Sequence, residues 1–472
     1  MADSTQVVVL GAGPGGYAAA FHAADLGMQV TLVDEESNPG GVCLYRGCIP
    51  SKALLHVAKV IDEARHADAW GVSFGQPVLD VNKLRSFKQA VVDKLTGGVG
   101  QVAKLRKVRF LQGRGTLTGP HSMSVAGANG TTELRFEHCV LATGSSPTRI
   151  PSLALDSDRM LDSTSALDLP DVPKKLLVIG GGYIGLELGS VYAALGSHVS
   201  VVEMTAGLLP GADRDLVQVL HKRLEKMFAS IMLNTKVVKV SQEGTTGIRV
   251  HFEGNADPSE QVFDRVLVAI GRRPNSKVPG LETTGVKVDQ KGFIRTDGQR
   301  RTAEPSIFAI GDVAGEPMLA HKASHEARVA IEAIAGHKAV FEPAAIPAVV
   351  FTDPEIAWAG LTEAQAQADG VDVEVAKFPW GASGRAITVD RPDGLTKLLL
   401  EPKTGRVLGV GIAGSGAGEL IAEGVHAIEM GATAEDMRLT IHPHPTLSET
   451  IMESAEVFFG QSTHVYKPKK RS

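Results

Sequence analysis

The sequence predicts an α/β protein that contains two copies of a βαβ unit and a C-terminal domain of the α+β class. Two glycine-rich segments, beginning at Gly11 and Gly180, each follow a short apolar run rich in β-branched residues. From about Ile346 onward, prolines, apolar alternation and helical stretches replace this pattern. At roughly 150 residues per domain, a chain of 472 residues has room for about three domains.

The first βαβ unit begins with an apolar strand over residues 6–10. Gly11, Gly13 and Gly16 follow in the pattern GxGxxG, and a helical stretch leads to a second strand that ends at Asp34. A glycine-rich loop that follows a strand, opens a helix and precedes an acid by about 20 residues is typical of a Rossmann-like unit. This pattern predicts a dinucleotide site.

The second unit repeats the arrangement after a strand over residues 176–179, with Gly180, Gly182, Gly185 and a strand that ends at Glu203. The first glycine and the acid are 23 residues apart in both units. In such loops the glycines permit a tight turn, close approach of the backbone to a pyrophosphate and close helix packing, while the acid binds ribose hydroxyls. We therefore expect two dinucleotide-binding domains. A pair of glycine turns that bind nothing is the alternative.

Later strands are expected to complete the two units. Residues 139–144 and 266–271 each read as an apolar strand that ends in a glycine loop, and a similar strand spans 307–312. We expect the chain to leave the first nucleotide domain, form the second and then return. The expected segments are the first nucleotide domain at 1–150, the second at 151–275, the return segment at 276–345 and the C-terminal domain at 346–472.

Composition and charge exclude several classes of protein. The net charge of −5 gives no reason to expect nucleic-acid binding, and three cysteines are too few for a secreted disulfide scaffold. Residues 7–24 lack Asp, Glu, Lys and Arg but contain four glycines and a proline, so we do not expect a membrane span. No targeting segment is recognisable, and the basic stretch 467–471 is interpreted as a solvated tail. A cytoplasmic protein is expected.

Cys43 and Cys48 are separated by four residues and flanked by glycines. Two thiols this close suggest a disulfide that opens and closes, and a helix expected to begin near Pro50 would lower their pKa values. Two reduced core cysteines are the alternative. A zinc site is less favoured because no second pair of ligands exists. Cys139 lies in an apolar strand and is expected to be inert.

A second candidate group lies near the C-terminus, where His442 and His444 precede Glu449. A histidine transfers protons near neutral pH, and a neighbouring carboxylate orients it and raises its basicity. Two alternatives stay open at this point. Residues 446–449 match a capping box, in which Glu449 only caps a helix, and His-x-His is a weaker metal pair.

Lys52 and Glu187 are charged residues beside these motifs. Lys52 follows Cys48 by four residues, so both lie on one face of a helix, and Glu187 lies inside the second nucleotide helix. Solvated faces would ordinarily explain both charges.

Three motifs taken together resemble those of the flavin-dependent disulfide oxidoreductases. They are GGVC-x4-CIPSK over residues 40–52, GGGYIGLE over 180–187 and HPTLSE over 444–449. The resemblance covers nearly the whole chain, and within the family it points to the members that oxidise dihydrolipoyl groups. It implies an FAD domain, an NAD domain, a central segment that belongs with the FAD domain and a C-terminal dimerisation domain.

The resemblance also implies residues for both cofactors. Asp34 stands where the family usually has Glu, and it keeps the carboxylate. Glu187 is implied to pair with Lys52. The residues implied for FAD are Gly11, Gly13, Gly16, Asp34, Lys52, Gly115, Asp312 and Ala320. Those implied for NAD are Gly180, Gly182, Tyr183, Gly185, Glu187, Glu203 and Gly271.

Within the NAD set, two residues have stated roles. Tyr183 is implied to cover the nicotinamide pocket. Glu203 favours NAD over NADP because an acid repels a 2′-phosphate, and no arginine follows it until Arg214.

The implied reaction oxidises dihydrolipoyl groups to the lipoyl disulfide and reduces NAD⁺ to NADH. Cys43 would exchange with the dithiol, Cys48 would pass electrons to the flavin, and His444 would take the thiol proton, oriented by Glu449. Family members are homodimers in which this histidine and acid come from the other subunit. The sequence departs from the family at residues 45–46, where Tyr-Arg replaces the usual Asn-Val.

The implied partners are a second copy of the chain and the lipoyl domains and acyltransferase core of 2-oxoacid dehydrogenase complexes, with glycine cleavage as a further possibility. A glutathione reductase would show arginines after the second glycine loop, and a mercuric reductase would need a C-terminal cysteine pair. The last cysteine here is Cys139. A structural subunit that keeps only the fold is a third rival, and the intact set of Cys43, Cys48, His444 and Glu449 argues against it.

Overall fold

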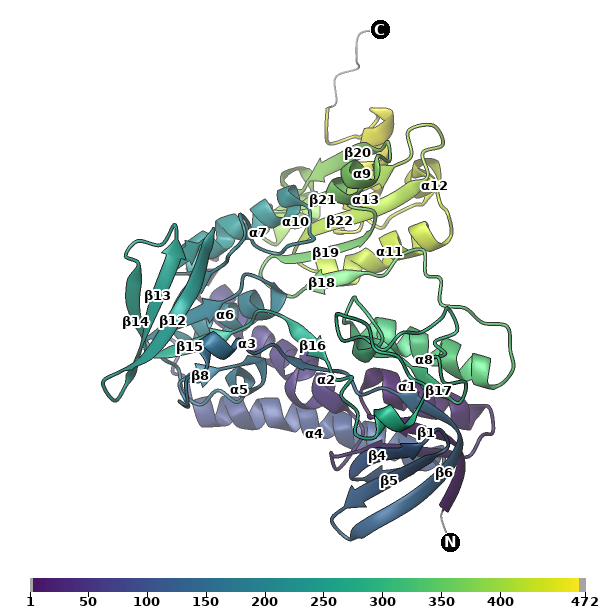
Figure 1. The fold of residues 1–472 in the computed structure, drawn as a ribbon. Coiled ribbons are helices and arrows are strands. Elements are labelled where there is room, and N and C mark those ends of the chain that lie inside the picture. The colour runs from purple at the N-terminus through teal and green to yellow at the C-terminus, as the bar shows by residue number, and fades with distance from the viewer. Residues whose placement is uncertain (1–2, 467–472) are drawn as a thin grey trace.

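The computed structural model describes residues 3–466, so the basic stretch 467–471 lies outside the described residues. Figure 1 shows the N-terminal sheet at the lower right, the second βαβ unit at the left and the C-terminal sheet at the top. Within the described range, no helix is both long enough and apolar enough to cross a bilayer.

The first sheet has seven strands in the order β3-β2-β1-β6-β5-β4, and β17 pairs with β6. β1 is parallel to β2 and β6, β6 is parallel to β17, and β4, β5 and β6 are antiparallel. The sheet is therefore built from two separated stretches of chain. Its strands are β1 (Asp3–Leu10), β2 (Val30–Asp34), β3 (Arg109–Gln112), β4 (Arg114–Gly119), β5 (Ser122–Gly127), β6 (Gly130–Leu141) and β17 (Ile307–Ala309).

Small side chains let two helices pack closely on this sheet. Ala19 and Ala20 of α1 (Pro14–Asp25) and Ala327 and Ala330 of α8 (Ala320–Ile334) are fully buried in one cluster with Val7 of β1. α8 follows β17, so the return segment supplies both a strand and a helix to the first unit. A long helix, α4 (Val81–Leu105), precedes β3.

The second unit has a five-stranded parallel sheet in the order β11-β10-β9-β15-β8. A separate antiparallel sheet, β12-β13-β14, packs against it. The strands are β8 (Met160–Leu161), β9 (Lys175–Ile179), β10 (His198–Val202), β11 (Ser230–Met232), β12 (Thr235–Glu243), β13 (Gly247–Gly254), β14 (Glu260–Phe263) and β15 (Arg265–Val268). The helices are α5 (Ser163–Leu167), α6 (Tyr183–Leu195) and α7 (Arg214–Met227).

The C-terminal segment forms an antiparallel five-stranded sheet in the order β18-β19-β22-β21-β20. Trp380 is fully buried in its core, where the indole N–H donates to Thr396 Oγ1 at 2.9 Å. The strands are β18 (Ala348–Val350), β19 (Glu355–Gly360), β20 (Glu374–Pro379), β21 (Leu395–Leu400) and β22 (Val407–Gly414). The helices are α9 (Glu363–Asp369), α10 (Gly384–Thr388), α11 (Ala417–Glu429), α12 (Ala434–Leu439) and α13 (Glu449–Phe459).

Two connections position the site between the units. β7 (Ser145–Pro147) and β16 (Arg272–Pro274) form a two-stranded antiparallel ribbon where the chain passes between the first and second units. After β2, the short helix α2 (Gly41–Arg46) leads into α3 (Cys48–His66), which packs against α6. α3 begins at Cys48, which is two residues earlier than the start expected near Pro50. The domain boundaries expected near residues 150, 275 and 345 stay predictions.

Candidate active site between the two nucleotide units

The two glycine loops have the same construction. Gly11 and Gly180 have φ angles of +98° and +109°, which favour glycine, and a Cβ on either would lie within 2.5 Å of a backbone oxygen. A Cβ on Gly16 or Gly185 would lie 1.8 or 2.3 Å from a carbonyl oxygen of its own loop. These four glycines therefore allow each helix to start directly against its strand, as the sequence pattern requires.

The middle glycine of each loop faces open space. A Cβ on Gly182 would meet no atom within 4 Å, and one on Gly13 would meet only Gly41 Cα at 4.0 Å. Gly13 and Gly182 are the N-cap residues of α1 and α6, and neither cap is satisfied by a side chain. The helix N–H groups are therefore directed at a place where a phosphate can approach, so both loops fit a dinucleotide.

The two acids also occupy equivalent positions. Asp34 accepts hydrogen bonds from the N–H groups of Ala12 at 2.6 Å and Glu36 at 3.0 Å. Glu203 accepts from Gly181 N at 2.8 Å and Thr205 N at 2.8 Å. Each carboxylate is thus fixed beside its glycine loop, where a ribose would lie.

A cavity of about 490 Å³ lies in front of the first glycine loop and extends to α3, α6 and α8. Both cysteines of the 40–52 motif line it. The predicted site residues among its lining are Gly11, Gly13, Gly16, Asp34, Cys43, Cys48, Lys52, Tyr183, Glu187, Asp312 and Ala320. One cavity therefore collects residues that are far apart in the sequence.

Other predicted residues lie outside this lining. Gly115 lies in β4, where a Cβ would be 2.6 Å from Leu10 Cδ1, so the sheet is closely packed here, and its contact with FAD stays a prediction. Gly271 follows β15 with a φ of +110° and open space around it. The remaining members, Gly180, Gly182, Gly185 and Glu203, belong to the second glycine loop and its acid.

The two thiols are not electrostatically equivalent. Cys43 is half-buried in α2, and Cys48 is open to the cavity at the start of α3. A hydrogen bond from Cys43 to Cys48, together with burial, raises the pKa of Cys43 well above its usual range. The same hydrogen bond, with the nearby Lys52 ammonium, lowers the pKa of Cys48 to about 7 against the effect of burial. In the dithiol form, Cys48 is therefore the thiol that ionises first.

Lys52 and Glu187, which the resemblance implies to be a pair, do form one. Lys52 Nζ lies 2.8 Å from Glu187 Oε2, and the Glu187 carboxylate is only 4% exposed. Glu187 Oε1 accepts from Phe351 N at 2.9 Å, and the Lys52 ammonium lies 4.4 Å from the centre of the Phe351 ring. The interpretation of two solvated faces is wrong, because α3 and α6 pack against each other at these positions.

The Cys48 pKa leads to a pH prediction. In the reduced protein, iodoacetamide should modify Cys48 with a midpoint near pH 7, because the thiolate predominates above the pKa of about 7. Lys52→Met should move the midpoint to higher pH, since it removes a charge that stabilises the thiolate. Peptide mapping across a pH series measures both profiles. A midpoint that stays the same in Lys52→Met contradicts the assigned charge effect.

His444 and Glu449 lie together in the C-terminal segment. His444 Nδ1 is 2.9 Å from Glu449 Oε1, and Glu449 Oε2 accepts from Thr446 N at 2.8 Å. Partial burial would raise the pKa of Glu449, but the hydrogen bonds from Thr446 N and His444 lower it. Glu449 is therefore an anion that orients the His444 ring, and it leaves Nε2 available for proton transfer.

The structure agrees only in part with the two alternatives for this segment. Half of the capping box over residues 446–449 is present, because Thr446 N–H donates to Glu449 Oε2, but Thr446 Oγ1 donates to Pro443 O and Ser448 is the N-cap of α13. A metal pair is also disfavoured, because His442 Nε2 lies 2.7 Å from Glu423 and so has its own carboxylate. His444 is 73% exposed and does not line the cavity with the cysteines. Within one chain, the structure does not bring the thiols and this histidine together.

Three further residues near the site are not identified from the sequence, and these are Arg272, Ser145 and Tyr17. Arg272 of β16 donates to Ser145 Oγ at 2.7 Å, and Ser145 Oγ donates to Asp312 Oδ2. Through these two hydrogen bonds, Arg272, which follows the last strand of the second unit, holds the Asp312 carboxylate in place. Burial, and then the charges of Cys43 and Cys48, raise the pKa of Tyr17 on α1. No local motif marks these residues, because each acts through contacts between distant segments.

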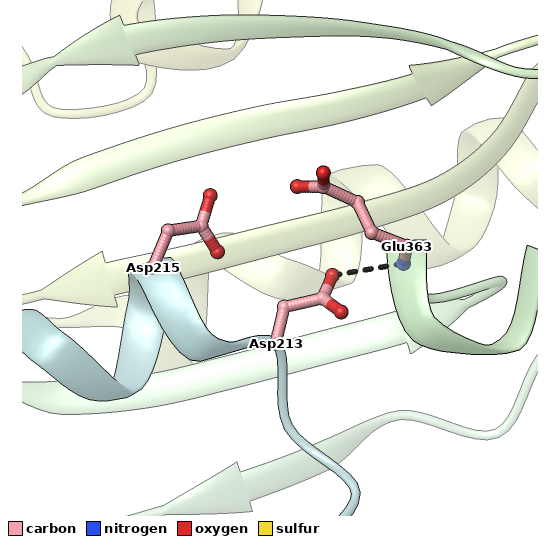
Figure 2. A group of neighbouring side chains, drawn as sticks. All are labelled: Asp213, Asp215 and Glu363. Atoms are coloured by element: carbon pink, nitrogen blue, oxygen red, sulfur yellow. Dashed lines mark hydrogen bonds between the residues drawn. The ribbon is translucent and has the colours of Figure 1, made fainter. Parts of the chain in front are cut away.

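One cluster of carboxylates elsewhere has the composition of a metal site. Figure 2 shows Asp213 and Asp215 at the start of α7 facing Glu363 of α9. The buried Lys397 Nζ lies 2.7 Å from Asp213, 2.8 Å from Asp215 and 2.7 Å from Glu363. The Lys397 ammonium is thus the central cation of this cluster, with Lys377 pairing with Asp215 and Glu363 from outside, and it connects the second unit to the C-terminal sheet.

Comparison with known proteins gives consistent results. A sequence model of the family described as pyridine nucleotide-disulphide oxidoreductase matches residues 5–327, and the dimerisation-domain model of the same family matches residues 346–455. The chain is 50% identical over 467 residues to a protein of Vibrio cholerae named dihydrolipoyl dehydrogenase, covering 99% of this chain and 98% of the relative. A Haemophilus influenzae protein of that name is 51% identical over 468 residues, with the same coverage.

Solved structures agree with the observed fold. The crystal structure of LpdA from Mycobacterium tuberculosis superimposes with a TM-score of 0.88 at 28% identity, covering 96% of this chain and 99% of that one. The Cu(II) complex of the flavoprotein disulfide reductase RclA from Escherichia coli gives a TM-score of 0.86 at 27% identity, covering 96% and 99%. The architecture described above is therefore that of flavoprotein disulfide reductases.

Proposed function

The chain belongs to the pyridine nucleotide-disulphide oxidoreductase family, and we propose that it oxidises dihydrolipoyl groups to the lipoyl disulfide while it reduces NAD⁺ to NADH and releases a proton. One observation carries this proposal. Cys43 and Cys48 line a single cavity with the Lys52–Glu187 pair, in a chain about half identical to full-length dihydrolipoyl dehydrogenases. The enzyme is an NAD-dependent flavoprotein oxidoreductase.

The residues present fit both cofactors. Gly11, Gly13, Gly16 and Asp34 would hold the ADP part of FAD, with Lys52, Asp312 and Ala320 beside the rest of the molecule. Gly115 would support this site from below. The loop from Gly180 to Gly185, with Tyr183, Glu203 and Gly271, would hold NAD. Bound FAD supplies a two-electron carrier between the cysteines and the nicotinamide.

The chain's own groups divide the thiol chemistry between them. A substrate thiolate attacks Cys43 in the oxidised Cys43–Cys48 disulfide, and Cys48 leaves as a thiolate. The second substrate thiolate then attacks the substrate sulfur of this mixed disulfide and displaces Cys43, which gives the lipoyl disulfide and the Cys43/Cys48 dithiol. Cys48, with its lowered pKa, is the thiol that would pass electrons to bound flavin, and Lys52 stabilises its negative charge. Glu187 holds Lys52 in place from α6. The substrate dithiol is thus oxidised by two electrons, and the cysteine pair is reduced by two electrons.

The substrate proton needs a base, and His444 does not line the cavity of its own chain. We assign this role to His444 of the partner subunit, oriented by Glu449 of the partner subunit. The dimerisation-domain match over residues 346–455 supports a homodimer. The exposed His444 ring, with its Nδ1 already engaged by Glu449, is arranged to accept a proton from outside its own chain. Each site would then be complete only in the dimer.

Glu203 provides a prediction about cofactor choice. Its buried carboxylate is fixed by three hydrogen bonds, and Arg214 is engaged by backbone carbonyl groups of residues 208, 209 and 212. Glu203→Gln should therefore lower the preference for NAD⁺ over NADP⁺ by about tenfold, because it removes the charge that repels a 2′-phosphate. The ratio of kcat/KM values measures this. Glu225→Gln, an exposed change on α7, is the control, and an unchanged ratio in Glu203→Gln contradicts the assignment.

For partners, we propose lipoyl domains and the acyltransferase core of a 2-oxoacid dehydrogenase complex, with the lipoyl protein of glycine cleavage as the second candidate. The chemistry supports this, since a lipoyl arm delivers a dithiol, and the cysteine pair lines an open cavity. We propose a cytoplasmic location because a disulfide that opens in every cycle suits a thiol-reducing compartment. A pull-down from cell extract, followed by identification of the lipoylated protein, tests the assignment of partners.

The central experiment uses the purified full-length protein. It should be yellow and should reduce NAD⁺ when dihydrolipoamide is added. A colourless protein, or turnover restricted to NADPH with oxidised glutathione, would overturn the proposal. A structural subunit that keeps only the fold would bind no flavin or would carry flavin without turnover.

A further inference from the structure

Tyr45 and Arg46 lie between the reactive cysteines, and the mechanism above assigns them no role. They occupy the last turn of α2, whose six residues are too few for a stable helix without tertiary contacts. The start of α2 is fixed by close packing, because a Cβ on Gly41 would lie 2.4 Å from Gly13 Cα. The end of α2 therefore depends on what Tyr45 and Arg46 contact.

Tyr45 binds the loop that follows β2. Its hydroxyl donates to Asn38 O at 3.1 Å and accepts from Asn38 N at 3.2 Å. Its ring lies against Gly40, where a Cβ would be 3.1 Å from Tyr45 Cε2. Asparagine at this position would be too short to make these contacts in the same way.

Arg46 binds the same loop two residues earlier. Its guanidinium forms an ion pair with Glu36, whose side chain is 25% exposed. The backbone N–H of Glu36 donates to Asp34, the acid placed beside the first glycine loop. Arg46 also lines the cavity together with Asp34 and Cys48. A valine at this position has no charge and would leave Glu36 unpaired.

We propose that Tyr45 and Arg46 are positioning residues that fasten the reactive-cysteine loop to the loop carrying Asp34. Through them, the part of the site that binds the flavin ribose and the part that holds the thiols act as one unit. This inference rests on the proposed function, because it assumes that flavin occupies the cavity. It predicts that weakening the contacts lowers flavin affinity and displaces the Cys48 thiolate at the same time.

The test uses purified holoenzyme and four variants. Tyr45→Phe removes only the hydroxyl, Arg46→Met removes the charge, and Arg46→Lys restores it. Glu36→Gln removes the partner of Arg46. Arg249→Met is the matched control, because Arg249 also pairs with carboxylates, is 35% exposed and lies on β13 in the separate antiparallel sheet.

Two quantities are measured for each variant. Flavin release on dilution, followed by fluorescence, gives the FAD dissociation constant. After addition of two reducing equivalents, the long-wavelength absorbance that a thiolate produces against oxidised flavin reports the position of Cys48. Arg46→Met and Tyr45→Phe should each raise the dissociation constant by about threefold to tenfold and lower this absorbance. Arg46→Lys should recover most of both, and Arg249→Met should change neither.

A double variant tests the partner assignment. Arg46→Met should add little to the effect of Glu36→Gln if the ion pair is the route of action. Retention of either wild-type flavin affinity or wild-type absorbance in both Tyr45→Phe and Arg46→Met overturns the inference. Failure of the unmodified protein to bind flavin or to reduce NAD⁺ overturns the proposed function instead, so the two failures are distinguishable.

Discussion

Replacing Cys48 with serine is expected to abolish NAD⁺-linked oxidation of dihydrolipoamide while flavin remains bound. Cys48 carries the low pKa of the pair and is open to the cavity, so its loss removes both the second half of the disulfide and the thiolate beside Lys52. Serine does not form a disulfide with Cys43. Turnover should fall by roughly three orders of magnitude or more, as is usual when a covalent participant is removed.

The control for this change is Cys139→Ser. Cys139 is fully buried in β6, and burial raises the pKa of its thiol, so it takes no part in exchange. This variant should keep its flavin and its rate, apart from any loss of stability. Flavin spectra and steady-state rates of NADH formation measure both outcomes. Full activity in Cys48→Ser, or complete inactivity in a flavin-bound Cys139→Ser, would contradict the roles given to the three cysteines.

Lys397→Met is expected to have the largest effect on stability. Lys397 is completely buried among Asp213, Asp215 and Glu363, and the substitution leaves three carboxylates without their central cation (Figure 2). Loss of one partner from a buried ionic group costs about 3–5 kcal/mol of unfolding free energy. Urea denaturation of the holoenzyme, compared with that of the unmodified protein, measures the difference.

Lys377→Met supplies the matched control. Lys377 pairs with Asp215 and Glu363 from the outside and is 40% exposed, so its removal should cost less than about 1 kcal/mol. Equal losses for the two variants would show that burial of Lys397 is unimportant.

The same cluster has a predictable pH dependence. Burial would raise the pKa of Asp215, but hydrogen bonds from Lys377 and Lys397 lower it below its ordinary value. A carboxyl group with a lowered pKa stabilises the fold above its unfolded-state pKa, and this contribution is lost as the pH falls through the folded-state pKa. The cost of Lys397→Met should therefore be largest near neutral pH and shrink in acid, where the carboxylates take up protons.

The sequence predicts local features of this protein well and long-range contacts poorly. The glycine loops are predictable because their requirements lie within one turn: Gly11 and Gly180 need positive φ angles, and Gly16 and Gly185 have no room for a Cβ. The pairing of Lys52 with Glu187 was implied only by resemblance. The two residues are 135 positions apart, and their individual charges look solvated.

Other features had no signal in the sequence at all. The link from Arg272 through Ser145 to Asp312 joins three segments that meet only when β7 and β16 pair. Lys397 lies in an apolar strand, and nothing near it in the chain indicates the carboxylates it meets. Such contacts depend on how whole sheets and helices pack, which no short window of sequence records.

The position of β17 has a consequence for synthesis on the ribosome. This strand pairs with β6, yet the entire second βαβ unit is made between them. When β6 leaves the ribosome, its outer edge in the parallel part of the sheet has no partner, and it waits until Ala309 and then α8 emerge. The second unit has all its own strands by Val268 and is able to fold first. The earliest part of the chain to be translated is therefore among the last to be completed, and its open edge is the point at which a nascent chain most needs protection from aggregation.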